Sequence, residues 1–443
     1  MNALNEFVYY SKYAKFLPSK NRKETLEESQ DDILYNTHIK HLEANYPHAL
    51  ESSIFNDMLL RTRDMMLKLK VFGSQRALQF RGPKILNRNE RIFNCVFGVA
   101  DKDSVFKDLM WILLAGCGAT LRIDPVHVNK LSSIKSPKGR VDYIITDDCE
   151  GFAYAVDKLM KAYFNGDKLP IFNYSQIRPA GAPISGGYLA PGPVGLRTCL
   201  DKIRILLDNL LSEKIYKLRP IHVYQIACYI ADSVLAGGVR RSALGILFAP
   251  EDEEMRLAKT GNWFIEHPEY ARSNNSIAFN RSTFTKDELE ECIKAAKEFG
   301  EPGFALLNGI YHGLNPCFEV SFDCFDIQSQ KTGWGFCNLC TISGKEIVNE
   351  EDFYEACRCA AFIGTIQASY NKFPFLGEIT ERIFKRDALL GVSISGIMTN
   401  PDLFLNKDVL ATGAKIVKET NTTIAKILGI NAAKRTTLVK PKY

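Results

Sequence analysis

The sequence predicts an α/β fold, either as one large barrel or as two or three domains. Segments with helical periodicity alternate along the chain with short apolar runs typical of strands, and this alternation favours a sheet covered by helices. The chain has 443 residues, 46% of them hydrophobic, which is enough for a sizeable core. No internal repeat, low-complexity segment or long linker interrupts the pattern.

The predicted elements follow from the spacing of apolar residues, as in 51–70, where Phe55, Leu59, Met66 and Leu69 recur at near-helical intervals. Helices are predicted over 22–43, 51–70, 104–115, 150–164, 196–212, 220–236, 285–299, 351–370 and 403–427. Strands are predicted over 92–98, 119–123, 142–146, 170–174, 243–248, 275–279, 303–307 and 316–322. Residues 178–195 are rich in Gly and Pro and form a predicted loop, which at that length is usually functional.

The composition indicates a reduced, cytoplasmic setting. The net charge is +5 from 56 basic and 51 acidic residues, so neither nucleic acid nor a membrane is expected as a partner. The N-terminus lacks the features of a signal peptide, and no apolar run reaches the ~20 residues that a membrane span needs. Twelve cysteines without an export signal favour free thiols over disulfides.

The spacing of cysteines and histidines predicts no metal site. Cys337 and Cys340 form the only C-x-x-C, and the second ligand pair of a zinc site is missing. His38 and His41 are predicted to lie on the surface of a polar helix. Eight other cysteines are predicted to be packing residues, because a buried free Cys behaves as a small hydrophobe: Cys117, Cys149, Cys199, Cys228, Cys292, Cys324, Cys357 and Cys359.

The sharpest local signal is the run Asn315-Pro316-Cys317-Phe318-Glu319. In an extended segment side chains alternate between faces, so Asn315, Cys317 and Glu319 are expected on one face, each ~6.6 Å from the next. An amide, a thiol and a carboxylate aligned in this way form a plausible reaction site. Spacing alone favours the alternative, a buried Cys in a strand with Glu319 solvated at an edge.

Companion motifs change this balance. Asn94-Cys95-Val96-Phe97, Asn315–Glu319 and Phe336-Cys337-Asn338-Leu339 occur in this order along the chain. Further motifs agree in order from about residue 8 onwards, at 10–18, 20–28, 147–152, 177–187, 237–243, 273–276, 301–303, 391–396 and 436–441. In order and residue identity they resemble the large catalytic chain of ribonucleotide reductases, most closely the adenosylcobalamin-dependent (class II) ribonucleoside-triphosphate reductases.

The resemblance implies a fold and a division of the chain. The expected architecture is a ten-stranded α/β barrel with a cysteine-bearing finger loop inside it. Residues 1–90 would form a mainly helical N-terminal region, and residues 91–443 the barrel, incomplete at its C-terminal side.

The resemblance also implies radical-based reduction of ribonucleotides to 2′-deoxyribonucleotides for DNA synthesis. Cys317 is implied as the thiyl radical that takes the ribose 3′ hydrogen atom, and Glu319 as the general base on the 3′ hydroxyl. Asn315 is implied to hold the sugar. Cys95 and Cys337 are implied as the redox pair, which requires Cα atoms ~5.5 Å apart to close a disulfide.

The same resemblance suggests ligands and partners. Adenosylcobalamin is the expected radical source, in preference to a metal-containing second subunit. Asn94 is a further implied substrate contact, for a ribonucleoside triphosphate. Asp147, Asp148 and Arg178 are implied to read a deoxynucleotide effector, although the two aspartates also suit a helix N-terminus. A thioredoxin-like protein is the expected reductant.

The sequence departs from the family at two places. Few residues separate Ile123 from Asp147, where the monomeric enzyme has an insertion that imitates a dimer partner. The sequence also ends just after Pro441, where the family continues into a Ser-Gly-Thr phosphate-binding loop. Three hypotheses follow: a split enzyme completed by a second chain, an inactive truncated fragment, or a nucleotide-binding protein without catalysis. The intact motif residues weigh against the last.

Overall fold

The computed structural model describes residues 3–184, 188–236, 239–240 and 243–440. Contacts within the chain divide these residues into two compact units. Unit 1 joins the described residues up to Asn94 with those from Phe336 onwards, and unit 2 comprises the described residues between Cys95 and Gly335. Within the described segments, the chain therefore passes between the units at two points, after Asn94 and after Gly335. Whether residues 1–90 form a domain of their own stays a prediction.

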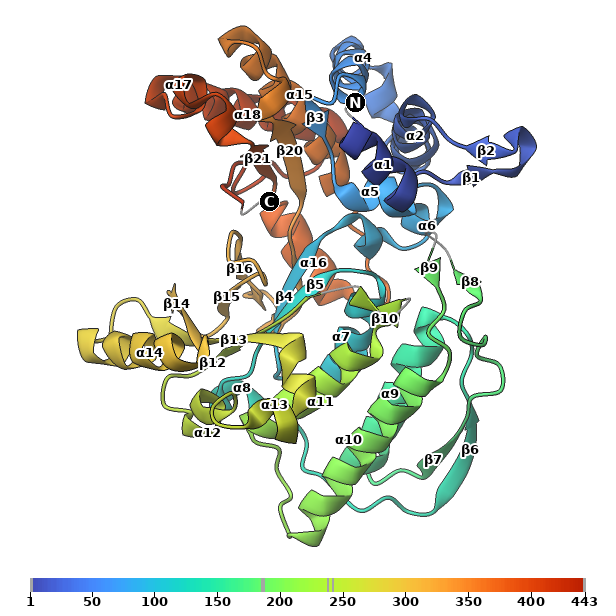
Figure 1. Ribbon diagram of the computed structural model, residues 1–443, viewed down its shortest axis with the longest axis vertical. Helices are drawn as coiled ribbons and strands as arrows, with labels where there is room; N and C mark the ends of the chain where they lie inside the picture. The colour runs from blue at the N-terminus through green and yellow to red at the C-terminus, as the bar shows by residue number, and fades with distance from the viewer. Residues whose placement is uncertain (1–2, 185–187, 237–238, 241–242, 441–443) are drawn as a thin grey trace. The chain divides into compact units, whose positions relative to one another are not determined.

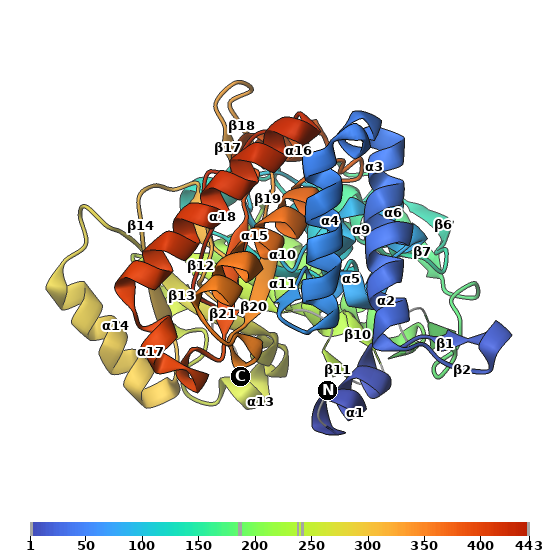
Figure 2. The same cartoon turned by 90° about the horizontal axis from the view of Figure 1, so that it is seen from above.

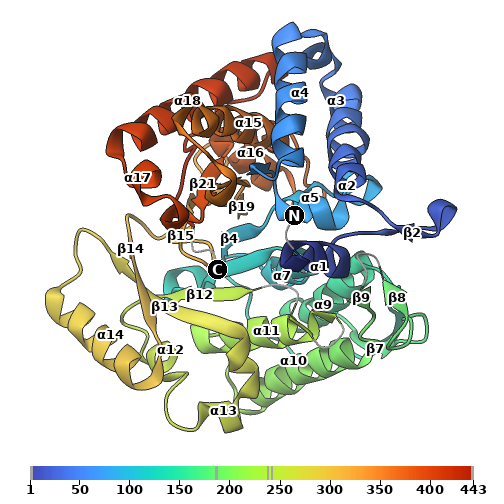
Figure 3. The ribbon, with the colours of Figure 1, turned by 45° about the horizontal axis from the view of Figure 1, so that its top comes forward.

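Five parallel strands organise unit 2 (Figures 1 and 3), in the order β14-β13-β12-β5-β4. Their bounds are β4 (Cys95–Val99), β5 (Gly118–Arg122), β12 (Leu244–Phe248), β13 (Ser273–Asn280) and β14 (Gly303–Leu307). The strands β4, β5 and β12 are buried at every position, the pattern of strands covered on both faces. Parallel neighbours require crossover connections, and helices supply them.

The connections of unit 2 carry its helices and short ribbons. The helices are α7 (Val105–Leu114), α8 (Pro125–Val128), α9 (Cys149–Phe164), α10 (Val194–Ser212), α11 (Pro220–Ser233), α12 (Glu253–Leu257), α13 (Trp263–Glu266), η5 (Pro268–Arg272) and α14 (Lys286–Phe299). The ribbons pair β6 (Arg140–Ile144) with β7 (Leu169–Asn173), β8 (Pro183–Ile184) with β9 (Tyr188–Leu189), β10 (Leu235–Ala236) with β11 (Val239–Arg240), and β17 (Phe325–Asp326) with β18 (Lys331–Thr332). The motif parts at 185–187, 237–238, 241–242 and 441 lie outside the described residues.

Unit 1 contains a small mixed sheet. Strand β20 (Leu339–Ser343) runs parallel to β21 (Gly391–Ser395) and antiparallel to β3 (Val71–Phe72). Residues 435–438 lie along the outer side of β21, where the Val392 amide donates to the Thr436 carbonyl at 3.0 Å and the Leu438 amide to the Val392 carbonyl at 3.1 Å. β19 (Gly335–Phe336) spans the point at which the chain enters this unit.

Helices cover the sheet of unit 1 (Figure 2). The central one is α15 (Glu350–Ala368), buried at every position from Cys359 onwards, which packs against α4 (Ser53–Leu67) and α18 (Lys407–Leu428). The remaining elements are α1 (Ala3–Lys12), β1 (Phe16–Leu17), η1 (Pro18–Lys20), β2 (Arg22–Lys23), α2 (Leu26–Ile33), η2 (Leu34–Ile39), α3 (Lys40–Asn45), η3 (Pro47–Glu51), α5 (Gln75–Phe80), α6 (Pro83–Leu86), η4 (Asn89–Ile92), η6 (Gly344–Glu346), α16 (Glu378–Asp387), η7 (Ile397–Thr399) and α17 (Pro401–Phe404).

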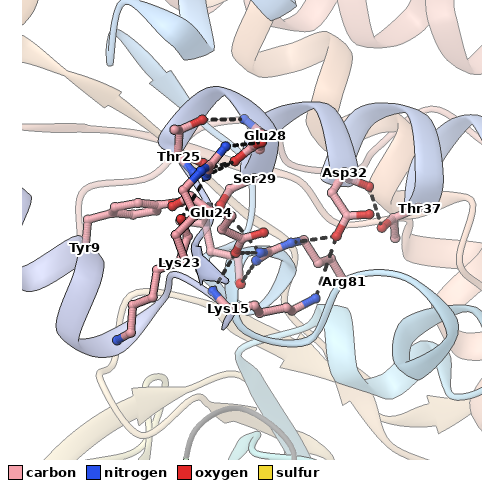
Figure 4. Close-up of polar contacts among 12 residues, drawn as sticks. Tyr9, Lys15, Lys23, Glu24, Thr25, Glu28, Ser29, Asp32, Thr37 and Arg81 are labelled. Atoms are coloured by element: carbon pink, nitrogen blue, oxygen red, sulfur yellow. Dashed lines mark hydrogen bonds and ion pairs between the residues drawn. The ribbon is translucent and has the colours of Figure 1, made fainter. Parts of the chain in front are cut away.

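A buried charge network ties the N-terminal segments of unit 1 together (Figure 4). The fully buried Arg81 side chain forms ion pairs with Glu24 and with Asp32, the latter at 2.8 Å. Glu24 also accepts a hydrogen bond from the Lys15 amide at 2.7 Å, and Tyr9 donates to the Thr25 carbonyl at 2.8 Å. Because the guanidinium has carboxylates on two sides, its charge is compensated where water cannot reach it.

The predicted surface position of His38 and His41 is wrong, because both side chains are buried. His38 Nδ1 hydrogen-bonds the Tyr370 hydroxyl at 3.1 Å, and His41 Nε2 hydrogen-bonds the Ser369 hydroxyl at 3.0 Å. The His41 ring also stacks on Tyr370, with ring centroids 3.8 Å apart. The polar composition of this helix indicated solvent exposure, but the two rings pack against the end of α15 instead.

The α/β class and most predicted elements are confirmed within a few residues. The predicted helix 403–427 is in fact two helices, since Asn406 caps a new start at Lys407 and accepts from the amides of Asp408 and Val409. The predicted strand 316–322 is wrong and is described with the site. No helix among the described residues is long and apolar enough to cross a bilayer.

Candidate active site

The motif from Asn315 to Glu319 forms the tip of a β-hairpin in unit 2. Strands β15 (His312–Leu314) and β16 (Ser321–Asp323) pair antiparallel, with His312 opposite Asp323 and Leu314 opposite Ser321. The Asn315 amide donates to the Val320 carbonyl at 3.1 Å, and the Phe318 amide donates to the Asn315 carbonyl at 2.9 Å. The three polar residues therefore do not alternate along an extended strand.

The turn has identifiable causes in the sequence. Pro316 has no N–H to give to a ladder, and the Asn315 side chain accepts from the Val320 amide at 3.0 Å, closing the tip from inside. Phe318 lies in the left-handed region with φ 66°, a conformation that ends a strand. The expectation that Asn315, Cys317 and Glu319 share one face of a strand is corrected accordingly.

Cys317 stands apart from the other cysteines in its exposure. All twelve cysteines lie within the described residues, and Cys317 alone is exposed, while Cys149 is half-buried and the other ten are buried. On either side of it, the Asn315 side chain is fully buried and both carboxylate oxygens of Glu319 are shielded from solvent. The tip thus carries one exposed cysteine between two residues whose polar side-chain atoms are buried.

The hairpin lies along β4 and β5 of the sheet. At the tip, Asn315 Nδ2 donates to the Sγ of Cys95, the first residue of β4, at 3.3 Å. Pro316 lies so near Gly118, the first residue of β5, that a Cβ there would be 3.4 Å from its ring. Farther back, a Cβ on Gly313 would be only 1.9 Å from Phe97, so only glycine permits this approach. The structure therefore brings Asn315 and Cys95 into contact.

The remaining motif residues are linked within unit 1. Asn94 Nδ2 donates to the Ser74 hydroxyl at 3.4 Å, and the Ser74 amide donates to Gln367 Oε1 at 2.7 Å. Gln367 Nε2 in turn donates to Asn338 Oδ1 at 2.7 Å, beside the fully buried Cys337. A chain of side chains thus connects Asn94 to the residue that follows Cys337.

Cys340 occupies a different environment from Cys337. It lies inside β20, where its Sγ accepts from Gln367 Nε2 at 3.6 Å and where a Cβ on Gly364 of α15 would be 2.9 Å away. Cys340 is therefore packed between strand and helix.

The three residues expected to bind an effector already make contacts within the chain. Arg178 forms an ion pair with Asp147, so these two lie together in unit 2. Asp148 is the N-cap of α9 and accepts from the Gly151 amide at 2.6 Å, which is the structural role that its position also suggested. A Cβ on Gly151 would be 2.3 Å from Thr146, so the helix start is tightly packed.

Seven of the eight cysteines predicted to be packing residues are buried, and Cys149 is half-buried. Burial raises the pKa of Cys199, Cys228, Cys357 and Cys359 to about 12, so these thiols stay protonated at neutral pH. Among the described residues, no group of three or more His, Cys, Asp or Glu side chains is placed to hold a metal ion.

Sequence reasoning missed the residues that hold the base of the hairpin. Arg122 and His127, near the end of β5, hydrogen-bond backbone carbonyls at 309–312, and Asp124 pairs with Arg122. The only local signal was two opposite charges at the end of a fully buried strand. Nothing near them in sequence indicates the carbonyls that they reach, one of them 190 residues away.

Comparison with known proteins supports one family. An adenosylcobalamin-dependent ribonucleoside-triphosphate reductase from Lactobacillus gasseri is 29% identical over 298 residues, which cover 59% of this chain and 36% of the relative. The corresponding protein of Levilactobacillus brevis is 27% identical, over 63% of this chain and 37% of that protein. The chain is similar to the ribonucleotide reductases. It spans little more than a third of the length of these curated relatives.

Solved structures of reductases share the fold. A B12-dependent (class II) ribonucleotide reductase superposes with a TM-score of 0.79 at 20% identity, over 98% of this chain and 72% of that chain. The alpha subunit of the class Id reductase from Actinobacillus ureae gives a TM-score of 0.54 at 11% identity, over 99% and 72% of the two chains. No protein-family model matches the chain. The α/β fold of the ribonucleotide reductase type is thus confirmed.

Proposed function

We propose that this chain catalyses the radical-based reduction of ribonucleotides, with ribonucleoside triphosphates as substrates and adenosylcobalamin as the radical source. The observation that carries the proposal is the hairpin tip, where the exposed Cys317 lies two residues from the buried Asn315, which contacts Cys95. A protein that only bound nucleotides would have no need for an outward thiol on a braced hairpin. The similarity to named reductases supports the same conclusion.

The chemistry assigns one step to each motif residue. The Cys317 thiyl radical takes the hydrogen atom from C3′ of the ribose, so that a C–H bond breaks and an S–H bond forms. Glu319 accepts the proton of the 3′ hydroxyl. The C2′–O bond breaks, the 2′ hydroxyl takes a proton and leaves as water, and a hydrogen takes its place at C2′. Cys95 and Cys337 supply the two electrons and two protons for this exchange as they join in a disulfide, and Glu319 returns its proton to the 3′ oxygen. Cys317 then returns its hydrogen atom to C3′, which restores the radical.

Asn315 and Asn94 are proposed to bind the sugar. The side-chain carboxamide of Asn315 already donates to Cys95 and accepts from the Val320 amide. A carboxamide has a second N–H and a second lone pair, which can bind a ribose hydroxyl. The Asn94 carboxamide, which donates to Ser74, also has a second N–H that can bind the sugar. Their existing bonds fix the amide planes before substrate arrives, which reduces the entropy lost on binding.

The exposed position of Cys317 fits a radical source that approaches from outside the polypeptide. When bound, adenosylcobalamin supplies the radical through homolysis of its cobalt–carbon bond. The chain itself exposes Cys317 and keeps ten of the other eleven cysteines buried, which protects those ten from side reactions.

Formation of deoxynucleotide tests the proposal. The purified chain would be incubated with a ribonucleoside triphosphate, a dithiol and adenosylcobalamin, once alone and once with a polypeptide covering the part of the Lactobacillus gasseri relative outside the match. We expect deoxynucleoside triphosphate in a reaction that stops when adenosylcobalamin is omitted. Turnover that required an iron- or manganese-containing subunit would contradict the cofactor, and absence of product in both arms would contradict the activity.

A second prediction concerns the redox pair. After one turnover without dithiol, peptide mapping should find Cys95 joined to Cys337, since these thiols supply the two electrons. The matched control is Cys340→Ser, which alters a packed thiol inside β20 and should leave the yield of the Cys95–Cys337 link unchanged. A bond between Cys337 and Cys340 would instead identify a simple C-x-x-C redox motif.

Three finer features are proposed from the resemblance. The five parallel strands of unit 2 would form half of a ten-stranded α/β barrel. Asp147 and Arg178 would contribute to a deoxynucleotide effector site, for which their ion pair would have to open or turn outward. A thioredoxin-like protein would reduce the disulfide.

A further inference from the structure

Side chains from the end of β5 hold three backbone carbonyls at the base of the hairpin. Arg122, the last residue of β5, donates from Nη1 to the carbonyl of Gly309 at 2.6 Å and to that of His312 at 2.9 Å. His127 of α8 hydrogen-bonds the Ile310 carbonyl through Nε2 at 2.8 Å. Both side chains are buried. The segment that leads into β15 is thus fixed at nearly every residue.

Asp124 fixes the direction of the Arg122 guanidinium. Its Oδ2 accepts from Arg122 Nε at 2.8 Å and pairs with Nη2 at 2.7 Å, and both side chains are only 6% exposed. A buried guanidinium without an anion would destabilise the fold, so Arg122 requires Asp124 as its partner. Because the guanidinium is a rigid planar fork, these two bonds also set where the remaining N–H groups point.

The hairpin is braced along the whole length of β5. Its base is held at Arg122, the last residue of that strand, and its tip at Pro316 lies against Gly118, the first. Between them, Gly313 lies against Phe97 without a side chain to separate them. Since β15 is short and contacts the sheet at both ends, a shift at its base is transmitted to the tip.

We propose that Arg122, oriented by Asp124, is a positioning residue that sets the location of Cys317 at the hairpin tip. The inference rests on the proposed function for its catalytic meaning, because only a reacting thiol must be held to within a fraction of an ångström. Arg122 acts through the backbone at 309–312 and does not touch the reacting atoms.

Hydrogen exchange and thiol alkylation test the brace without any turnover. The variants are Arg122→Met and Arg122→Lys, with Arg272→Met as the matched control, because Arg272 is also ion-paired in unit 2, with Asp232 at 2.6 Å, but away from the hairpin base. In Arg122→Met we expect amides of 309–324 to exchange at least about tenfold faster, as two charge-assisted hydrogen bonds are lost. Iodoacetamide should also alkylate Cys317 at a changed rate.

The pattern of exchange decides between a brace and a general loss of stability. Amides of β12 and α10 should keep their protection in Arg122→Met, and Arg122→Lys, which retains the charge but not the fork, should lie between wild type and Met. Unchanged exchange in the hairpin, or equal acceleration throughout unit 2, would overturn the inference. If Arg122→Met fails to fold, Arg122→Lys carries the same comparison.

A turnover arm separates this inference from the proposed function. If the wild-type chain reduces nucleotides, Arg122→Met should lower kcat at least about tenfold with KM within about twofold, and Arg122→Lys should recover part of kcat. A loosened hairpin with wild-type kcat would refute positioning while leaving the reductase activity intact. A wild type that reduces nothing would refute the proposed function, and the exchange data would still decide whether Arg122 braces the hairpin.

Discussion

Replacing Cys317 with serine is expected to abolish nucleotide reduction, with a loss of at least about 10³-fold in turnover. Serine is nearly isosteric, but its O–H bond does not shuttle hydrogen atoms as a thiol does, so the chemical step has no substitute. The tip is closed by backbone bonds and by the Asn315 side chain, and a serine at the exposed position 317 keeps nearly the same shape. The unfolding free energy should therefore stay within about 0.5 kcal/mol of wild type.

Two measurements make this test decisive. Since Cys317 alone is exposed among the twelve cysteines, the native chain should take up one equivalent of iodoacetamide rapidly, and Cys317→Ser should take up none. Cys292→Ser is the control: Cys292 is buried in α14, where its Sγ donates to the Pro302 carbonyl at 3.5 Å, a bond that serine can also make. Turnover retained in Cys317→Ser would show that another group carries the radical.

The second large effect is expected on stability in mild acid. Burial, the largest cause in each case, lowers the pKa of His38 to about 3 and that of His41 to about 4, against an ordinary value of 6.5. Below pH 6.5 the two histidines therefore bind protons in the unfolded chain but stay neutral in the folded chain. Stability is complete above that pH and falls as the pH drops toward the folded values, by about 1.4 kcal/mol for each histidine between pH 7.5 and 5.5.

Urea unfolding at the two pH values measures this loss. The double variant His38→Asn and His41→Gln keeps a hydrogen-bonding group near Tyr370 and Ser369 but cannot take up a proton. We expect it to lose about 3 kcal/mol less than wild type between pH 7.5 and 5.5. His48→Gln, at an exposed site of the same unit, is the control. Equal losses in wild type and the double variant would show that the buried rings do not govern the acid response.

The sequence was informative wherever local signals and packing agree. α14 begins where predicted because Thr285 and Glu288 cap each other's backbone amides, a pattern readable from four residues. The strands β4 and β12 were visible because continuous apolar runs mark strands covered on both faces. In the candidate site, the order of the cysteine motifs indicated a shared site for Cys95, Asn315 and Cys337. Of these, Asn315 and Cys95 are in contact.

The predictions that were wrong or missing concern residues whose positions depend on side-chain contacts and on partners distant in the sequence. The hairpin tip looked extended because the residue with positive φ is Phe318 rather than a glycine, and because Asn315 closes the turn with its side chain. Arg122 gave no sign of its role, since its carbonyl partners are 187 and 190 residues away. His38 and His41 carried a polar signature, but the surface on which they pack is formed by residues more than 300 positions later.

The Arg81 network sets a limit on how this polypeptide can be dissected. Its two anions come from either side of Thr25, and Tyr9 reaches the same segment from α1. A shortened chain that began after Asp32 would leave Arg81 as a buried cation with neither anion, a situation that costs about 3–5 kcal/mol. That is a large share of the 5–15 kcal/mol that holds a typical domain folded. Residues 9–32 are thus an integral part of unit 1.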